Sequence, residues 1–178
     1  MGLILVLDQA VKIWIKTHMG LGEEIRLFDW FRIHFTENYG IAFGLQLFGR
    51  HGKVIITLLR ILIAAVLLYG LHRLSCLPDL RRGFKVAAAL IAAGALGNII
   101  DSVFYGVAFG YDGWLHGRVV DMFFFPIAEW RWPDWLPGIG GRRYLFFQYI
   151  FNVADAALTV GVVLIIFFYR RELRRLPI

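Results

Sequence analysis

The chain has 178 residues, of which 59% are hydrophobic and 18% charged, and its mean hydropathy is +0.65. Soluble domains carry about a quarter charged residues, so this composition excludes an ordinary soluble domain and predicts one small membrane domain. The net charge of +6 does not indicate nucleic-acid binding, because the basic residues cluster beside apolar stretches. The single cysteine, Cys76, excludes a disulfide framework and a thiolate metal site.

Four apolar stretches predict four transmembrane helices, at about 1–19, 54–71, 84–106 and 145–169. Two basic clusters flank the later stretches, one of Arg73, Arg81, Arg82 and Lys85, the other of Arg170, Arg171, Arg174 and Arg175. Such clusters are typical of cytoplasmic loops. We therefore expect a multi-pass membrane protein with both termini in the cytoplasm. Residues 20–52 and 107–144 would lie outside, and 1–178 would form one domain.

The two outer segments differ in character. Residues 30–36 alternate apolar and polar side chains, which predicts a half-exposed strand. The second outer segment combines tryptophans with prolines and predicts a segment at the lipid–water interface, where indoles prefer to lie. Its characteristic residues are Trp114, Trp130, Trp132, Trp135, Pro126, Pro133 and Pro137.

Polar residues inside the third and fourth apolar stretches are the main functional candidates, since ionisable groups are costly in lipid and face a cavity or a partner. Asn98 and Asp101 share one helix face at i,i+3 spacing, and Asn152 and Asp155 share another. At 1.5 Å per residue, Asp101 and Asp155 reach similar depths in the outer half of the bilayer. Asp121 lies at the same outer rim.

Two interpretations of these residues are open. They could be interhelical hydrogen-bonding groups beside small residues. Alternatively, Asp121 and Asp155 form a carboxylate pair around one water. Two neighbouring carboxylates do not ionise together easily, so one keeps a proton while the other activates water. Elimination favours the pair for an outward-facing hydrolase. Ser102 has no nearby lysine, Cys76 lies on the cytoplasmic side, and no HExxH zinc motif occurs.

Five motifs resemble those of the lipoprotein signal peptidases (signal peptidase II). In chain order they match D-Q-x-x-K, N-x-G-x-A-F, G-x-x-G-N-x-x-D, V-V-D and F-N-x-A-D. The matching residues are Asp8-Gln9 with Lys12, Asn38-Tyr39-Gly40-Ile41-Ala42-Phe43, Gly94 to Asp101, Val119-Val120-Asp121 and Phe151-Asn152-Val153-Ala154-Asp155.

The resemblance implies a four-helix membrane fold with a small extracytoplasmic β-cradle and an interfacial amphipathic segment or helix. It implies an aspartic endopeptidase of the bacterial inner membrane, with Asp121 and Asp155 as catalytic residues facing the periplasmic side and with no metal or cofactor. The substrate would be a diacylglyceryl prolipoprotein in membrane lipid, cut before its lipidated cysteine. Residues that bind substrate or support the site would be Asn38, Gly40, Asn98, Asp101, Asn152, Asp8 and Lys12.

The sequence departs from the family pattern in two places. Ser102 stands where the family usually has arginine, and the stretches between Asp101 and Asp121 and after Asp121 are long. Asp8 and Lys12, at i,i+4, are expected to form a structural ion pair. Arg60, in the middle of the second apolar stretch, is expected to snorkel outward or to line the bundle.

Two other functions compete with the endopeptidase. A small transporter could relay ions through Asp101 and Asp155, but Val160 to Phe168 contains no ionisable residue to continue the path. An assembly protein would use the polar pairs for packing alone. No nucleic-acid partner is expected. The oligomeric state stays open, and a monomer is compatible with the sequence.

Overall fold

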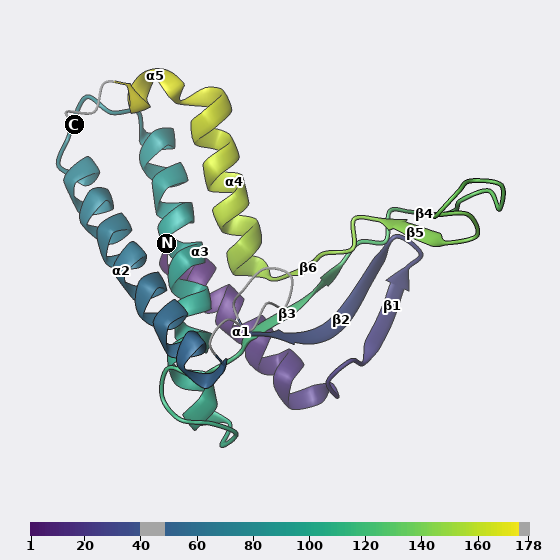
Figure 1. The fold of residues 1–178 in the computed structure, drawn as a ribbon. Coiled ribbons are helices and arrows are strands. Elements are labelled where there is room, and N and C mark those ends of the chain that lie inside the picture. The colour runs from purple at the N-terminus through teal and green to yellow at the C-terminus, as the bar shows by residue number, and fades with distance from the viewer. Residues whose placement is uncertain (40–48, 175–178) are drawn as a thin grey trace.

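A computed structural model describes residues 1–39 and 49–174. Its elements are α1 (Gly2–His18), β1 (Glu24–Phe28), β2 (Phe31–Asn38), α2 (Gly49–Ser75), α3 (Arg82–Ala108), β3 (Val119–Phe124), β4 (Ala128–Arg131), β5 (Arg143–Phe146), β6 (Ile150–Phe151), α4 (Val153–Phe168) and α5 (Arg170–Leu173). The fold is mainly helical with a small antiparallel sheet. Helices α2, α3 and α4 lie side by side, and α1 packs against α3, α4 and β3 (Figure 1).

Two of the described helices, His51–Ser75 within α2 and α3, are long and apolar enough to cross a membrane. The other two long helices are shorter, with 17 residues in α1 and 16 in α4. A span of the hydrocarbon takes about 20 residues. Two apolar helices of membrane length are therefore clear, and the expected count of four spans stays a prediction.

The fourth apolar stretch is not one helix over 145–169. Its first residues form β5 and β6, and α4 begins only at Val153. The run before it is rich in aromatic residues, which favour strands. Asn152 then starts the helix as its N-cap, with its side chain accepting a hydrogen bond from the Asp155 N–H at 2.9 Å.

The strand predicted at 30–36 is confirmed as β2, the second strand of a four-stranded sheet in the order β1-β2-β3-β6. All its pairings are antiparallel, and β2 lies beside β3 with Thr36 opposite Asp121 and Asn38 opposite Val119. The sheet lies at the end of the bundle where α4 begins (Figure 1).

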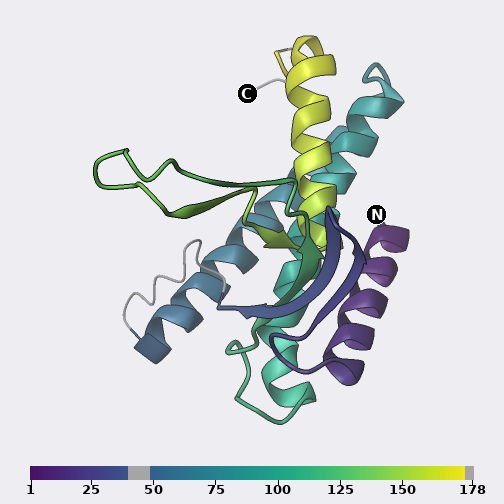
Figure 2. The ribbon, with the colours of Figure 1, turned by 90° about the vertical axis from the view of Figure 1, so that its right-hand side faces the viewer.

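The tryptophan-rich segment forms a second, two-stranded sheet of β4 and β5. We name residues 128–146 the arm, because this hairpin extends away from the helices in both views (Figures 1 and 2). Between Phe109 and Asn152 the structure has no helix. An interfacial helix is therefore not found in this outer segment, and residues 40–48 of the first outer segment lie outside the described part of the chain.

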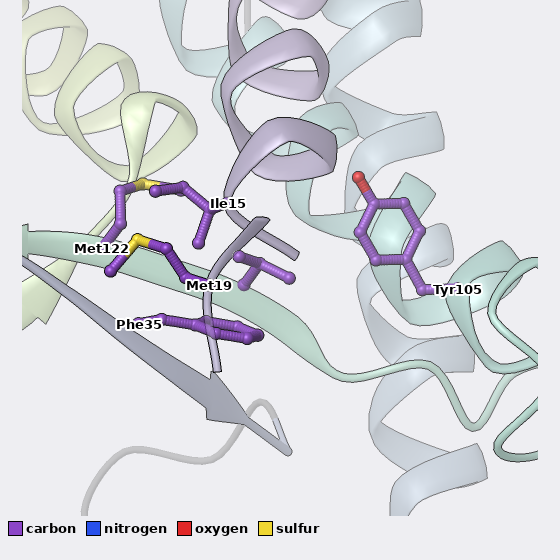
Figure 3. Close-up of a cluster of buried hydrophobic side chains, with 6 residues drawn as sticks. Ile15, Met19, Phe35, Tyr105 and Met122 are labelled. Atoms are coloured by element: carbon purple, nitrogen blue, oxygen red, sulfur yellow. The ribbon is translucent and has the colours of Figure 1, made fainter. Parts of the chain in front are cut away.

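A hydrophobic core fastens the sheet to the bundle. Ile15 of α1 and Met19, which directly follows that helix, meet Phe35 of β2, Tyr105 of α3, and Val120 and Met122 of β3 (Figure 3). All six side chains are at most 7% exposed. Val120 and Met122 of β3 point into this core. Because side chains alternate along a strand, the Asp121 side chain between them points to the opposite face of the sheet.

Candidate active site

Asp155 and Asp121 reach one place from different elements. Asp155 lies in the first turn of α4, and Asp121 lies in the middle of β3. Asn152 joins them, since its side-chain amide donates to Asp121 Oδ1 at 2.6 Å while its Oδ1 accepts the Asp155 N–H. The helix N-cap thus also links the Asp121 carboxylate to the backbone of Asp155.

The long stretch between Asp101 and Asp121 is accounted for by a chain reversal. Helix α3 continues for two more turns to Ala108, and the chain then folds back along it. The Gly117 N–H donates to the Ser102 carbonyl at 2.9 Å, and the Val120 N–H donates to Asp101 Oδ2 at 3.2 Å. A Cβ at position 117 would lie 1.9 Å from the Asp101 carbonyl oxygen, so this close approach requires glycine.

Asn98 extends the hydrogen-bond network to α3. Its amide donates to Asp155 Oδ1 at 2.7 Å, and its Oδ1 accepts from Asn152 at 3.1 Å and from Lys12 at 2.9 Å. The two asparagines at i,i+3 from the two helical aspartates therefore contact each other. Together they fix the orientation of Asp155 relative to Asp121.

A buried ion cluster supports the site from α1. The expected Asp8–Lys12 ion pair is present at 2.9 Å, and Lys12 also binds Asp101 at 2.8 Å. Gln9 donates to Asp101 at 2.9 Å, and the other oxygen of Asp8 accepts the Ala154 N–H at 2.8 Å. Buried charges are tolerated when paired and hydrogen-bonded, and here the pairing ties α1 to both α3 and the start of α4.

Small residues allow these helices to come close enough for such contacts. A Cβ on Gly97 would lie 2.7 Å from an Asp8 carboxylate oxygen and 2.9 Å from the Ala154 Cβ. Neither neighbour has room to retreat, since Asp8 and Ala154 are both fully buried. Glycine at this position is therefore a packing requirement of the site.

The environments of the two carboxylates differ. Asp121 is only 4% exposed, whereas Asp155 is half-buried. Burial, and next the neighbouring Asp155 carboxylate, raise the pKa of Asp121 to about 7 from its ordinary value of 3.8. A pair in which one carboxyl group keeps its proton near neutral pH can supply an acid and a base.

An apolar pocket of about 460 Å³ opens beside Asp155. Phe147, Tyr149 and Phe151 form one wall, and Ala156, Thr159 and Val160 of α4 form another. Val160 is half-exposed on the outer surface of α4. The pocket therefore leads from the side of the bundle to one of the two carboxylates.

Most of the predicted site residues come together. Asp8, Lys12, Asn98, Asp101, Asp121, Asn152 and Asp155 form one connected network. Asn38 lies at the end of β2, opposite Val119, and Gly40 lies outside the described residues. In the described ranges, no group of three or more His, Cys, Asp or Glu is arranged to hold a metal ion.

Sequence reasoning gave no role to Lys53 and Thr57 on the inner face of α2, and it left two positions open for Arg60 on the same helix. Arg60 does not snorkel outward but lines the bundle, where its guanidinium donates to the Ser102 hydroxyl at 3.3 Å. Thr57, one turn earlier, is fully buried and donates to the Leu115 carbonyl at 3.0 Å. The signal was the spacing of Lys53, Thr57 and Arg60, which places three polar residues on one side of an apolar helix.

Comparison with known proteins gives a consistent result. The family model for signal peptidase II matches residues 1–170. A lipoprotein signal peptidase from Porphyromonas gingivalis is 42% identical, covering 95% of this chain and 80% of its own length. One from Chlorobium phaeobacteroides is 31% identical, covering 97% of this chain and 94% of its own length.

Two solved structures of bacterial membrane enzymes share the fold. The first has a TM-score of 0.64 at 28% identity and covers 99% of this chain and 89% of its own. The second has a TM-score of 0.62 at 29% identity and covers 98% and 90%. The matches extend over nearly the whole chain, and the range of the family model contains every residue of the carboxylate network. The chain therefore belongs to the signal peptidase II family, the lipoprotein-processing proteases of bacterial membranes.

Proposed function

We propose that this chain is an aspartic endopeptidase that cuts diacylglyceryl prolipoproteins immediately before the lipidated cysteine, with Asp121 and Asp155 as the catalytic pair. Membership of the family supports removal of signal peptides from prolipoproteins. The catalytic type and the position of the cut are inferred from the site.

The observation that carries this proposal is the double use of Asn152. One side chain holds the buried Asp121 carboxyl and the backbone of the more accessible Asp155. Groups held by buried hydrogen bonds keep the geometry that catalysis needs. A packing role alone does not explain why two carboxylates are brought together and one of them is left open to a pocket.

In the proposed reaction Asp121 carries the proton and Asp155 is ionised. Asp155 removes a proton from water, and the resulting hydroxide attacks the carbonyl carbon of the scissile amide. Asp121 donates its proton to the carbonyl oxygen, which forms a neutral tetrahedral gem-diol. On collapse, Asp121 takes back a proton from one hydroxyl, and the proton held by Asp155 passes to the leaving nitrogen. The products are a free amine at the cysteine and a carboxyl group on the signal peptide.

The apolar pocket supports substrate access from the lipid. A signal-peptide helix already lies in the bilayer, and each buried methylene of a diacylglyceryl group adds ~0.8 kcal/mol to membrane partition. Two acyl chains therefore hold the cysteine at the depth where α4 begins. We propose that the scissile segment passes between the helices beside Val160 and that the strands close over it.

The arm fits the lipid–water interface. Its exposed side chains include Trp130, Trp135, Tyr144 and Phe146, and such aromatic residues concentrate at membrane surfaces. The arm projects at the level where α4 begins, to one side of the helix bundle (Figure 1). With four spans and both termini in the cytoplasm, this end of the bundle faces outward.

Purified enzyme in lipid nanodiscs, incubated with one prolipoprotein sequence in lipidated and unlipidated form, tests this proposal. Asp121→Asn and Asp155→Asn are each expected to lower turnover by about a thousandfold or more, in the range typical for loss of an acid–base group. The double variant should be little worse, because the pair acts as a unit. Asp29→Asn, whose side chain is 87% exposed, is the matched control.

Substantial turnover in either single variant would refute the dyad. Equal cleavage of the unlipidated peptide would refute positioning by the lipid and would indicate a water-facing cleft instead. A protein that served only assembly would retain its cellular function with both substitutions in place.

A further inference from the structure

Helix α2 has a polar stripe on its buried side, although most of its surface is apolar. Lys53, Thr57 and Arg60 follow one another at i, i+4 and i+7 and so share one face. Lys53 is 7% exposed and Thr57 is fully buried. An arginine in a membrane helix is costly and faces a cavity or a partner, so the position of the Arg60 side chain requires an explanation.

Arg60 points toward the turn of α3 that carries the site. Its guanidinium donates to Ser102 Oγ at 3.3 Å, and that hydroxyl donates to the Asn98 carbonyl at 2.9 Å. Ser102 is fully buried and Arg60 is half-buried. Asn98 in turn binds the Asp155 carboxylate. One turn of α3 thus carries both the contact to Arg60 and the contact to Asp155.

The charge of Arg60 acts on the aspartates of the site. Among these aspartates, its electrostatic interaction is strongest with Asp155, followed by Asp121 and then Asp101. Lys12, the cation on the α1 side, forms its direct ion pairs with Asp8 and Asp101. Arg60 therefore approaches from the α2 side, where the carboxylate that it favours most is the half-exposed one.

We propose that Arg60 is a positioning residue that directs the shared proton to Asp121 and keeps Asp155 ionised for attack by water. A cation stabilises the nearer anion more strongly, and two carboxylates that share one proton respond to such a difference. This inference rests on the proposed aspartic mechanism. It gives a physical reason why Asp121 holds the proton and Asp155 does not, although the two side chains are chemically identical.

In the described part of the chain, charged groups that interact with Arg60 come from α2, α3, β3 and α4. Lys53 lies on its own helix, Asp101 on α3, Asp121 on β3 and Asp155 on α4. Beyond them, Lys12 of α1 binds Asp101 and acts on Asp121. Without the positive charge of Arg60, the surroundings of Asp121 and Asp155 are more negative. Both protonation steps of this pair then occur at higher pH.

The test is the pH profile of lipopeptide cleavage in nanodiscs. Arg60→Met removes the charge and retains a long apolar side chain, Arg60→Lys retains the charge, and Arg73→Met removes an exposed arginine from the same helix. For Arg60→Met we expect both limbs of the profile to move to higher pH by about one unit. At a fixed pH on the acidic limb, the loss of turnover relative to the native protein is then about tenfold larger than the loss at the optimum. Arg60→Lys should restore the profile, and Arg73→Met should not change it.

An unshifted profile in Arg60→Met would overturn the proposal for Arg60 and would leave the aspartic mechanism standing. If turnover is too slow for a profile, a double-mutant cycle on thermal unfolding decides. Arg60→Met should destabilise the native protein more than it destabilises the Asp155→Asn variant. Additive effects would show that Arg60 and Asp155 are not coupled. Failure of the dyad itself would appear separately, as residual turnover in Asp121→Asn or Asp155→Asn.

Discussion

Replacement of Asp121 by asparagine should change how the stability of the protein depends on pH. Burial and the Asp155 carboxylate raise the pKa of Asp121 to about 7 in the folded protein, compared with 3.8 ordinarily. Between these two pH values the folded state binds more protons than the unfolded state. The free energy of unfolding of the native protein therefore falls as pH rises across this window. Asparagine is neutral throughout, so the variant lacks this contribution.

The size of the effect follows from the two pKa values. The gap between 3.8 and about 7 corresponds to about 4 kcal/mol, since one pKa unit is worth about 1.36 kcal/mol. Only the part between pH 5 and pH 8 is measured in practice, which is roughly 3 kcal/mol. At roughly 2–4 °C per kcal/mol for a chain of this length, the melting temperatures should differ by about 10 °C. Asn152 can still donate to the new amide oxygen, so the geometry is retained.

Thermal unfolding followed by tryptophan fluorescence in one detergent at pH 5 and pH 8 measures this difference. The melting temperature of Asp121→Asn relative to the native protein should rise by about 10 °C from the lower to the higher pH. Comparison within each pH removes effects of other groups, and Asp29→Asn should show no such change. A constant difference between variant and native protein at both pH values would refute the assignment of the proton to Asp121.

Three further predictions concern positioning, packing and topology. Asn152→Ala should lower turnover by about a hundredfold with a smaller change in KM, as measured by steady-state kinetics. The reason is that Asp121 and Asp155 both lose their hydrogen bonds to the Asn152 side chain. Gly97→Ala should destabilise the protein by about 1–3 kcal/mol, since its Cβ would lie 2.7 Å from a buried carboxylate oxygen. Gly113→Ala, with nothing within 4 Å of its Cβ, is the control in thermal unfolding. Cysteines placed at Arg82 and Trp132, in a background without the natural cysteine, should be labelled from outside only at position 132; the reverse pattern would invert the topology.

Much of the chemistry was determined by the sequence alone. Lipid tolerates few ionisable groups, so carboxylates inside apolar stretches are conspicuous without a structure. The i,i+3 pairs Asn98/Asp101 and Asn152/Asp155, and the i,i+4 pair Asp8/Lys12, depend only on helix geometry. The alternation at 30–36 likewise predicted β2. Each of these patterns lies within a few residues, where local geometry decides the outcome.

Contacts between distant residues were decided by the tertiary structure. The Asp8 carboxylate binds the Ala154 N–H across 146 residues, and Asn98 binds Asp155 across 57. No local pattern specifies such pairs, because they depend on how closely α1, α3 and α4 pack. The same holds for Arg60, which reaches Ser102 only because α2 lies beside α3.

The boundary of α4 and the shape of the arm also needed the structure. Hydropathy does not distinguish an aromatic strand from the start of a membrane helix, so residues 145–151 and α4 formed one apolar run in the sequence. The chain divides them at Asn152, whose side chain caps the helix and binds Asp121. The cap contact is local, whereas the contact with Asp121 forms only when the folded chain brings β3 to that side chain. The sequence by itself determined which residues carry the chemistry, and tertiary packing determined how they are paired and oriented, because hydrogen bonds across elements form only when those elements meet.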